Sequence, residues 1–510
     1  MNYYKVPPAK LLQIKTLSEL KGAGYQPKTI KEEIRDNLIK RLQNNEQVFA
    51  GIWGYEETVI PDFERALLSR HNISLLGLRG QAKTRLARMM VHLLDEYIPI
   101  IAGSEMNDDP LQPLSRYGKD QIAEHGDDTH ISWLHRDTRY SEKLATPDVS
   151  VADLIGDVDP IKAASLKLPY SDERVIHYGL IPRSHRCIFV INELPDLQAR
   201  IQVALFNILQ EGDIQIRGFK LRLPLDIHFV FTANPEDYTN RGSIVTPLKD
   251  RIGSQIITHY PSTIDISKRI TLQEAKIKEV QQEIVKVNEI AKDLVEQVAF
   301  EARDSEYVDA KSGVSARLSI SAYENLISAA ERRSLISGDK STHIRVTDFI
   351  GVIPAITGKV ELVYEGEQEG PGIVAQNLLG KAIRRQFTNY FPNPEEIRKT
   401  QKDKSPYKKI IDWFEGGNSL DLLHSLSEQE YQKVLKSVPG LSELVDKFAN
   451  ESKADEKWFL MEFALHGLAE YSLLSKQKLA TGTQFTDLLS SMFSMPKPEQ
   501  DDEDDFDKFN

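Results

Sequence analysis

The chain has 510 residues, enough for two or more domains, and its 40% hydrophobic and 27% charged residues are typical of a soluble protein. No apolar run approaches the roughly 20 residues that span a bilayer, and no signal-peptide pattern opens the chain, so we expect a cytoplasmic location. The formal charge of -12 argues against a protein that coats nucleic acid, and the single cysteine, Cys187, excludes disulfide pairs within the chain and a cysteine zinc cluster.

The first seventy residues predict helices. Residues 1–50 carry apolar side chains at a spacing of three to four, which indicates an N-terminal helical segment packed on the next domain. A solvated extension is the alternative. Gly54-Tyr55-Glu56 then precedes an amphipathic helix, and this turn is a candidate contact for an adenine base.

Residues 72–85, NISLLGLRGQAKTR, have the order of a phosphate-binding loop. They predict a short buried strand, a turn with two glycines, and a helix that opens at Lys83-Thr84. Backbone N–H groups at the helix start would bind phosphate oxygens, Lys83 the β- and γ-phosphates, and the Thr84 hydroxyl Mg²⁺. The candidate nucleotide-binding residues are Gly77, Arg79, Gly80, Gln81, Ala82, Lys83, Thr84 and Arg85.

Ala82 stands where such loops usually have glycine before the lysine. If this position is helical, alanine can occupy it without a φ penalty. The alternative for the whole motif is a glycine-rich turn that merely enters a helix.

Residues 103–150 are polar with little periodicity and predict a long surface insertion. His125, His130 and His135 fall here beside several aspartates. A metal site is one interpretation. The spacing matches no standard zinc pattern, which favours histidines in an exposed loop.

Two apolar runs end in polar residues. The run from Cys187 to Ile191 predicts a central parallel strand whose carboxyl end faces the nucleotide, with Glu193 polarising the attacking water. Asn192 replaces the usual Asp there, so we expect weaker Mg²⁺ binding or slower hydrolysis.

A helix over 197–212 and a hairpin turn at Gly218 lead to a second strand. That strand ends at Asn234, which would orient the water, and an Asn-Pro turn is the alternative there. For the first strand, the alternative is an ordinary buried strand with a glutamate at its edge.

The rest of the chain is mainly helical in pattern. We divide it into a core at 51–260, a helical lid at 261–358, a C-terminal helical domain at 359–495 and an acidic tail at 496–510. Arg251 follows a short helix and Arg317 opens a lid helix; each could instead be a surface arginine. The tail is either a solubility tail or a dock for a basic partner.

The ordered set of motifs resembles the AAA+ ATPases, and most closely the clade of the magnesium-chelatase I subunit and the MoxR-type ATPases. The likeness covers roughly residues 50–355 and includes NDDPLQPL (107–114), YGLIPRSHRCIFVINEL (178–194) and FTANPED (231–237). It implies an α/β fold: a P-loop αβα core with a helical lid. The departures from the family pattern are Ala82, Asn192 and Arg186.

The resemblance also implies roles and partners. Glu193 would activate water, Asn234 act as a sensor, Arg251 as the arginine finger in a neighbouring site and Arg317 as the lid sensor. Thr84 and Asn192 would hold Mg²⁺. ATP would bind between subunits of a hexameric ring, and a von Willebrand A domain on a separate chain would be the partner.

Three functions remain open from the sequence. The leading one is an ATP-hydrolysing motor that remodels a partner protein or inserts a metal into it. The second is an ATP-gated scaffold with little turnover, suggested by Asn192. The third is a transcriptional regulator with a related core, which lacks support because neither its characteristic loop nor a basic helix-turn-helix is visible.

Overall fold

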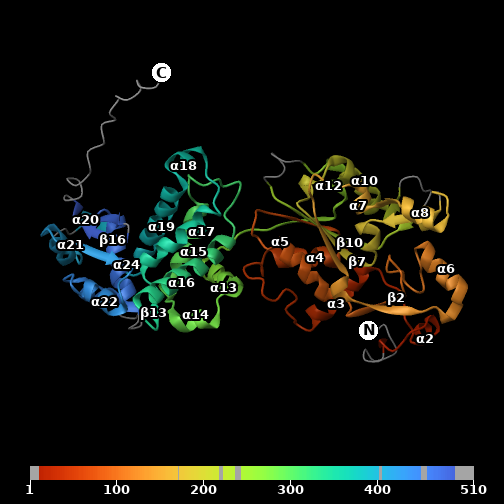
Figure 1. The fold of residues 1–510 in the computed structure, drawn as a ribbon, viewed down its shortest axis with the longest axis horizontal. Coiled ribbons are helices and arrows are strands. Elements are labelled where there is room, and N and C mark those ends of the chain that lie inside the picture. Colours follow the sequence, from red (N-terminus) through yellow and green to blue (C-terminus); the bar gives the residue numbers. More distant parts are fainter. Residues whose placement is uncertain are drawn as a thin grey trace, which may run out of the picture. The chain divides into compact units, whose positions relative to one another are not determined.

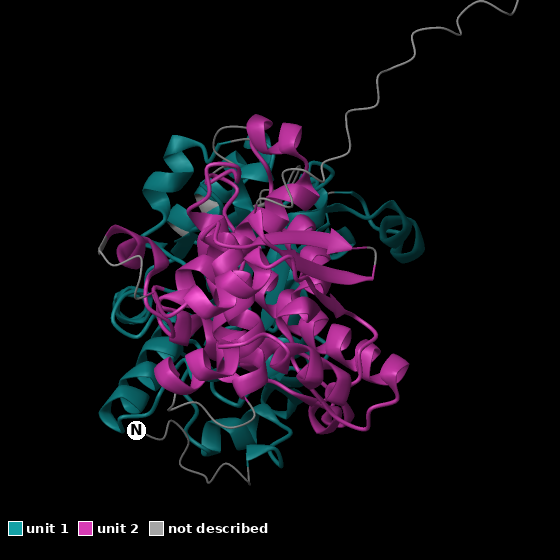
Figure 2. Ribbon diagram, turned by 90° about the vertical axis from the view of Figure 1, so that its left-hand side faces the viewer, with its two compact units in different colours: residues 1–261 teal, residues 262–510 magenta. Residues whose placement is uncertain are grey.

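A computed structural model describes residues 11–170, 172–216, 222–235, 243–400, 405–449, 456–479 and 481–488 (Figure 1). The chain forms two compact units, residues 1–261 and 262–510 (Figure 2). None of the described helices is both long and apolar enough to cross a lipid bilayer.

A five-stranded parallel sheet forms the centre of the first unit. Its spatial order is β11 (Ser254–Ile257), β1 (Ile73–Leu76), β10 (Ile227–Ala233), β7 (Cys187–Asn192) and β4 (Tyr140–Leu144). All residues of β10 are buried, because strands of a parallel sheet that is covered on both faces are apolar throughout. The carboxyl ends of β1, β10 and β7 therefore meet at one edge of the sheet.

Short helices and antiparallel strand pairs complete the first unit. The helices are α2 (Leu17–Gly22), α3 (Ile30–Gln43), α4 (Val59–Leu68), α5 (Lys83–Met89), η1 (Met90–Leu93), α6 (Arg116–His125), η2 (Gly126–Asp128), η3 (Arg136–Thr138), α7 (Val151–Leu154), α8 (Pro160–Leu166), η4 (Glu173–Val175), α9 (Leu180–Arg183), η5 (Leu194–Asp196), α10 (Ala199–Glu211) and α12 (Thr246–Arg251). The strand pairs are β2 (Tyr97–Ile101) with β3 (Ile131–His135), β5 (Gly156–Val158) with β6 (Ile176–Tyr178), and β8 (Asp213–Gln215) with β9 (Arg222–Pro224).

Helices cover both faces of the central sheet. On β7, Ile188 and Val190 join the apolar cluster on one face, and Phe189 and Ile191 join the cluster on the other, as the two-residue period of a strand requires. Figure 1 shows α3, α4 and α5 on one side of the strands and α10 and α12 on the other. The predicted α/β fold class, a parallel sheet in an αβα arrangement, is confirmed.

The helices expected before residue 51 are α2 and α3. Thr29 begins α3 with a capping box, accepting from the Glu32 N–H. Leu38 of α3 lies in the apolar cluster on the sheet. On the same helix, the Glu33 carboxylate receives two bonds, 2.7 and 2.6 Å long, from the buried Arg139 guanidinium. This helical segment is therefore part of the core of the first unit.

The predicted insertion at 103–150 extends too far along the chain. Tyr140–Leu144 form β4, which pairs in parallel with β7 from Tyr140↔Ile188 to Leu144↔Asn192. The sequence YSEKL lacks the apolar run of a central strand because β4 lies at the edge of the sheet, where its residues are only partly covered. The insertion therefore ends before this strand.

The second unit is mostly helical, with a small antiparallel sheet in the order β14–β16–β15. Its helices are α13 (Ile264–Glu274), α14 (Glu279–Ile284), α15 (Glu289–Arg303), α16 (Arg317–Ser337), η6 (Val346–Val352), α17 (Ile353–Thr357), α18 (Tyr364–Glu369), α19 (Pro371–Phe387), α20 (Pro394–Thr400), α21 (Lys408–Glu415), α22 (Glu428–Lys436), α23 (Leu441–Phe448) and α24 (Lys457–Glu470). Its strands are β12 (Val285–Lys286), β13 (Thr342–His343), β14 (Leu420–Leu423), β15 (Ser475–Leu479) and β16 (Gly482–Thr486).

One apolar cluster runs through the second unit from Val285 to Phe485. Helix α19 packs on both α15 and α24. The predicted lid at 261–358 and the predicted C-terminal domain at 359–495 thus contribute side chains to the same cluster.

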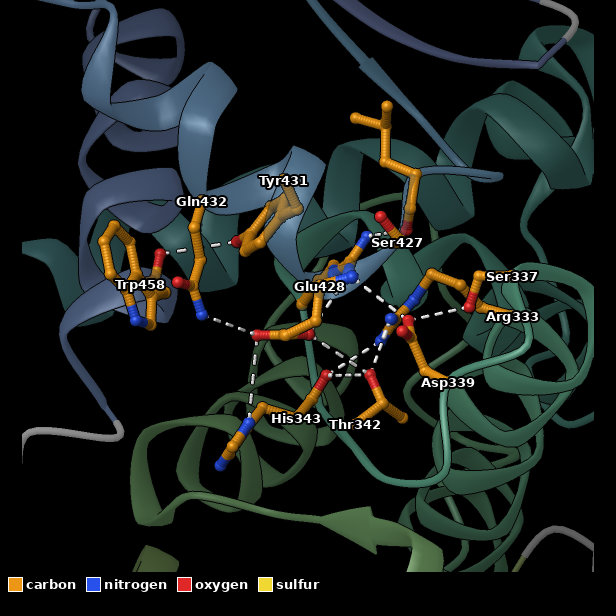
Figure 3. Close-up of polar contacts among 12 residues, drawn as sticks. Arg333, Ser337, Asp339, Thr342, His343, Ser427, Glu428, Tyr431, Gln432 and Trp458 are labelled. Atoms are coloured by element: carbon orange, nitrogen blue, oxygen red, sulfur yellow. Dashed lines mark hydrogen bonds and ion pairs between the residues drawn. The ribbon is translucent and has the colours of Figure 1, made fainter.

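Polar contacts join the same two stretches (Figure 3). Arg333 of α16 donates to Thr342 Oγ1 and to the His343 carbonyl, both at 2.7 Å. The Glu428 N–H at the start of α22 donates to Asp339 Oδ2 at 3.0 Å. The Arg333 contacts are local, whereas the bond between Glu428 and Asp339 links residues 89 positions apart and fixes the start of α22 beside the end of α16.

Two sequence predictions fall outside the described residues. The hairpin turn at Gly218 is one, although the flanking β8 and β9 are paired in antiparallel fashion. The acidic tail at 496–510 is the other.

Candidate functional site

The phosphate loop follows β1 and leads into α5. The Gly77 N–H donates to the Ala233 carbonyl at 3.1 Å, which ties the loop to the end of β10. A Cβ on Gly77 would lie 1.9 Å from Thr258 Oγ1 and 2.2 Å from Gln81 Oε1, so a side chain is excluded there. Gly80 has a φ of 74°, a conformation that favours glycine.

The condition under which alanine would carry no φ penalty at position 82, a helical backbone, is not met. Its φ is 56° and its ψ is 16°, in the left-handed region, immediately before α5 begins at Lys83. The loop turns here, and the helix starts only at the next residue. Alanine therefore occupies a position that favours glycine.

Lys83 is buried, with 7% of its surface exposed. Its ammonium donates to Asn234 Oδ1 at 2.7 Å, to the Leu78 carbonyl at 3.0 Å and to the Gly77 carbonyl. The positive charge thus lies inside the loop, where phosphate oxygens would compete with these three acceptors.

Glu193 and Asn234 lie together at the carboxyl ends of adjacent strands β7 and β10. Asn234 Nδ2 donates to Glu193 Oε2 at 2.9 Å. Glu193 has a φ of 55°, and its N–H donates to Thr232 Oγ1 at 3.2 Å. With Lys83 on the carbonyl oxygen of Asn234, the three side chains form one hydrogen-bonded chain beside the phosphate loop.

Asn192 faces the start of α5. Its Oδ1 accepts from Thr84 Oγ1 at 3.4 Å and from Thr232 Oγ1 at 3.1 Å. Oxygen donors of this kind suit Mg²⁺, and the predicted pair of Mg²⁺ residues, Thr84 and Asn192, is in contact. Both donors are neutral, so the pair lacks the charge that a carboxylate would add.

Residues outside the predicted set also hold the phosphate loop in place through hydrogen bonds. The buried Tyr55 hydroxyl donates to the carbonyls of Gln81 at 2.9 Å and His259 at 2.8 Å, and burial raises its pKa. Tyr260 donates to the Arg79 carbonyl at 2.9 Å, and Thr258 to Gln81 Oε1 at 2.7 Å. The turn at Tyr55 is predicted as a candidate adenine contact. In the structure, the Tyr55 hydroxyl holds the phosphate loop.

The two predicted arginines lie in different units. In the first unit, the Arg251 guanidinium donates to Gln210 Oε1 at 2.9 and 2.7 Å and to the Pro247 carbonyl at 2.7 Å, and lies 5.5 Å from the centre of the Phe206 ring. Arg317, in the second unit, begins α16 and is exposed. Their roles stay predictions.

The histidines of the predicted insertion do not form a metal site in the described part of the chain. Within these residues, no group of three or more His, Cys, Asp or Glu side chains is arranged to hold an ion. His135 lies on β3 and not in an exposed loop, and makes a local contact of 3.4 Å with Asp137.

No protein-family model matches the chain. Among solved structures, it is similar to a predicted ATPase from Cytophaga hutchinsonii, with 15% identity over 71% of this chain and 97% of that one and a TM-score of 0.28. It is also similar to a chain of the magnesium-chelatase BchI–BchD complex (19% identity, 63% and 98% covered, TM-score 0.32) and to NtrX from Brucella abortus with ADP (13%, 57% and 52%, 0.31). Likenesses this distant carry no argument about function, so the fold class rests on the strand order and phosphate loop of this chain.

Proposed function

We propose that the chain binds ATP with Mg²⁺ and hydrolyses it as a subunit of an AAA+ ring motor, which remodels a partner protein in the manner of the magnesium-chelatase and MoxR-type ATPases. The observation that carries this proposal is the hydrogen-bonded chain from Lys83 through Asn234 to Glu193. It brings a cation, an amide and a carboxylate to the end of a phosphate loop, which are the groups that phosphoryl transfer to water requires.

In this mechanism, N–H groups at the start of α5 bind phosphate oxygens. Lys83 exchanges the carbonyls of Gly77 and Leu78 for the β- and γ-phosphates, and Asn234 keeps its bond to Glu193. The water oxygen bonds to the γ-phosphorus as the bond to the ADP oxygen breaks, and Glu193 accepts a proton from that water.

Thr84 and Asn192 are the residues that would hold Mg²⁺. The bound ion would neutralise charge on the phosphate oxygens. Because Asn192 brings a carbonyl where a carboxylate is usual, we expect this chain to need more Mg²⁺ for half-maximal activity than a variant with Asp at the same position.

The ring and its partner extend the proposal beyond this chain. Arg251 would enter the nucleotide site of a neighbouring copy, and Arg317 would reach the γ-phosphate from the lid. Among the contacts of the described residues, the Arg251 guanidinium bonds α10 and its own helix and not the phosphate loop, which is compatible with a role toward another subunit. A hexamer and a von Willebrand A domain partner are parts of this proposal.

The test compares ATP binding and phosphate release for the wild type, Lys83→Ala and Glu193→Gln. Lys83→Ala should lose ATP binding. Glu193→Gln should keep binding but lower the hydrolysis rate by about 100-fold or more. Lys119→Ala and Glu124→Gln change exposed residues of α6 in the same ways and should behave as wild type. Equal hydrolysis rates in all five proteins would contradict the proposal.

The second candidate function is an ATP-gated scaffold with little turnover. The observation in its favour is the uncharged contact between Asn192 and Thr84. It predicts that ATP drives assembly while phosphate release stays negligible, and that Asn192→Asp raises the release rate by about tenfold. A fast wild-type rate that Asn192→Asp leaves unchanged would remove this candidate.

A further inference from the structure

Thr232 places a buried hydroxyl at the carboxyl edge of the central sheet. It lies on β10, and only 1% of its surface is exposed. Strand β10 pairs with β7 in a register that joins Phe231 to Ile191. Since parallel strands keep their register, Thr232 lies beside Asn192, at the point where β7 ends.

The Thr232 hydroxyl makes two hydrogen bonds of opposite direction. Its Oγ1 accepts from the Glu193 N–H at 3.2 Å and donates to Asn192 Oδ1 at 3.1 Å. A hydroxyl has one proton to donate and two positions at which to accept. One side chain thus contacts the backbone of the candidate base and the amide of the candidate Mg²⁺ residue.

The first of these bonds stabilises a turn that directs the Glu193 side chain. On β7, Ile191 joins the apolar cluster on one face of the sheet and Val190 joins the cluster on the other. If the strand stayed extended, Glu193 would point to the same face as Ile191. Its φ of 55° turns the chain instead, and its carboxylate contacts Asn234 at 2.9 Å. A left-handed backbone is unfavourable for glutamate, so the bond from its N–H to Thr232 helps to hold this turn.

The second bond fixes which end of the Asn192 amide faces α5. Only one of the two terminal atoms of an amide accepts a hydrogen bond, whereas both oxygens of a carboxylate do. Rotating the amide by half a turn would take the acceptor away from the buried Thr232 proton, which is costly. Thr232 therefore keeps Asn192 Oδ1, which also accepts from Thr84 at 3.4 Å, on the side where Mg²⁺ would bind.

We propose that Thr232 is a positioning residue for ATP hydrolysis, an inference that rests on the proposed function. Its hydroxyl holds the turn that directs the Glu193 carboxylate to Asn234. It also orients the carbonyl oxygen of Asn192 toward the Mg²⁺ site, a task that arises because this chain has an amide there. In both tasks Thr232 acts through its neighbours.

The first test removes the hydroxyl and measures phosphate release. Thr232→Val should lower kcat about tenfold or more and leave the KM for ATP unchanged, because the phosphate loop is intact. Thr232→Ser keeps the hydroxyl and should behave as wild type. Thr129→Val is the matched control, since Thr129 is also 1% exposed and donates to the Gly126 carbonyl at 2.6 Å.

Hydrogen exchange without nucleotide tests the turn directly. In a peptide covering 190–196, exchange should be about tenfold faster in Thr232→Val than in wild type, because the Glu193 N–H loses its acceptor. Thr232→Ser and Thr129→Val should match the wild type in this peptide. Thermal unfolding checks that each variant is folded, and Thr232→Ala replaces Thr232→Val if the latter is not.

The Mg²⁺ affinity of the ADP-bound protein, measured by calorimetry, tests the orientation of Asn192. Thr232→Val should raise the half-saturating Mg²⁺ concentration about tenfold. The same substitution in an Asn192→Asp background should cause no such shift, because either carboxylate oxygen can face the ion. A general disturbance of the site would weaken Mg²⁺ binding in both backgrounds.

The outcomes separate this inference from the proposed function. A wild type that releases no phosphate would contradict the ATPase proposal, while the exchange and Mg²⁺ measurements would still test Thr232. If the wild type hydrolyses ATP, equal kcat values for Thr232→Val and Thr129→Val would overturn the role of Thr232 alone. Equal Mg²⁺ shifts in the two backgrounds, or unchanged exchange in Thr232→Val, would overturn it as well.

Discussion

At the residue scale, two non-glycine residues of the candidate site have a left-handed backbone conformation. Ala82 and Glu193 have φ values of 56° and 55°. Each such residue costs about 1–2 kcal/mol relative to a right-handed conformation. At Glu193 this conformation accompanies the bond from its N–H to Thr232 and the contact of its carboxylate with Asn234. The Ala82 side chain makes no hydrogen bond, and only its packing against the apolar cluster on the sheet offsets the strain there.

Ala82→Gly should therefore stabilise the protein or leave its stability unchanged. Removing the Cβ relieves the strain, and the greater freedom of glycine in the unfolded chain offsets part of that gain, leaving up to about 1 kcal/mol. Urea unfolding measures the change. Ala123→Gly, at an exposed position inside α6, should instead cost about 1 kcal/mol. A loss of stability in Ala82→Gly as large as in the control would contradict this account of the loop.

At the element scale, a buried polar cluster lies at the amino-terminal ends of β7 and β10. The Arg186 guanidinium donates to the Pro99 carbonyl at 2.8 Å and to the Tyr25 hydroxyl at 2.9 Å, and lies 3.2 Å from Asp109. These contacts explain why a large charged side chain is accommodated at position 186. They join the helical N-terminal segment, the β2 strand and the central sheet.

Asp226 and His185 lie in this cluster and oppose each other in their response to pH. The Asp226 N–H donates to His185 Nδ1 at 3.0 Å. Burial raises the pKa of Asp226 to about 6 from 3.8, and burial lowers the pKa of His185 to about 4 from 6.5. Between pH 4 and 6 the folded state holds a proton on Asp226 that the unfolded chain has released, so acidification stabilises the fold through Asp226. The unfolded chain protonates His185 first, so acidification destabilises the fold through His185.

Single variants should expose the two opposed effects. On acidification from pH 6.5 to 4.5, the free energy of unfolding of Asp226→Asn should fall by about 2 kcal/mol more than that of the wild type, because the stabilising protonation of Asp226 is lost. The free energy of unfolding of His185→Asn should fall by about 2 kcal/mol less than that of the wild type, because the destabilising protonation of His185 in the unfolded chain is lost. Urea unfolding at the two pH values measures this. Asp128→Asn, at an exposed position, should follow the wild type. The same change in unfolding free energy with pH in all four proteins would contradict the opposed effects of Asp226 and His185.

At the scale of the whole molecule, the second unit combines the predicted lid and the C-terminal helices. Glu462 of α24 is fully buried and accepts from two N–H groups of η6 and from the Tyr431 hydroxyl at 2.7 Å. Helices α15, α19 and α24 pack in sequence. If ATP moves the lid, this shared core would carry the C-terminal helices with it.

Glu462→Gln should loosen both stretches together. The amide places donors against the N–H groups of η6, at a cost of about 1–3 kcal/mol, so hydrogen exchange should rise about tenfold or more in both 346–352 and 457–470. Glu443→Gln changes an exposed side chain of α23 and should leave exchange unchanged. Faster exchange confined to 457–470 would mean that the two stretches open separately.

Much of the first unit could be predicted from local pattern. The phosphate loop, the runs ending at Asn192 and Asn234, and the helix after residue 197 each follow from neighbouring residues, because apolar periodicity and glycine position act over a few residues. Glu193 and Asn234 each follow an apolar run, and parallel strands share a carboxyl edge. In the structure the two side chains are in contact at 2.9 Å.

Other features depended on contacts between distant residues. Strand β4 was not recognised because an edge strand needs no apolar run, and its pairing with β7 is what defines it. Tyr55, Thr258 and Tyr260 support the phosphate loop from positions that no local motif marks. The backbone of Ala82 is set by the turn that the surrounding loop imposes. The sequence by itself thus determined the phosphate loop and the polar residues that follow the two strands, since these reside in short motifs. Only the tertiary structure decided which residues hold the loop, where the sheet ends and which helices share a core, since those depend on packing between segments far apart in the chain.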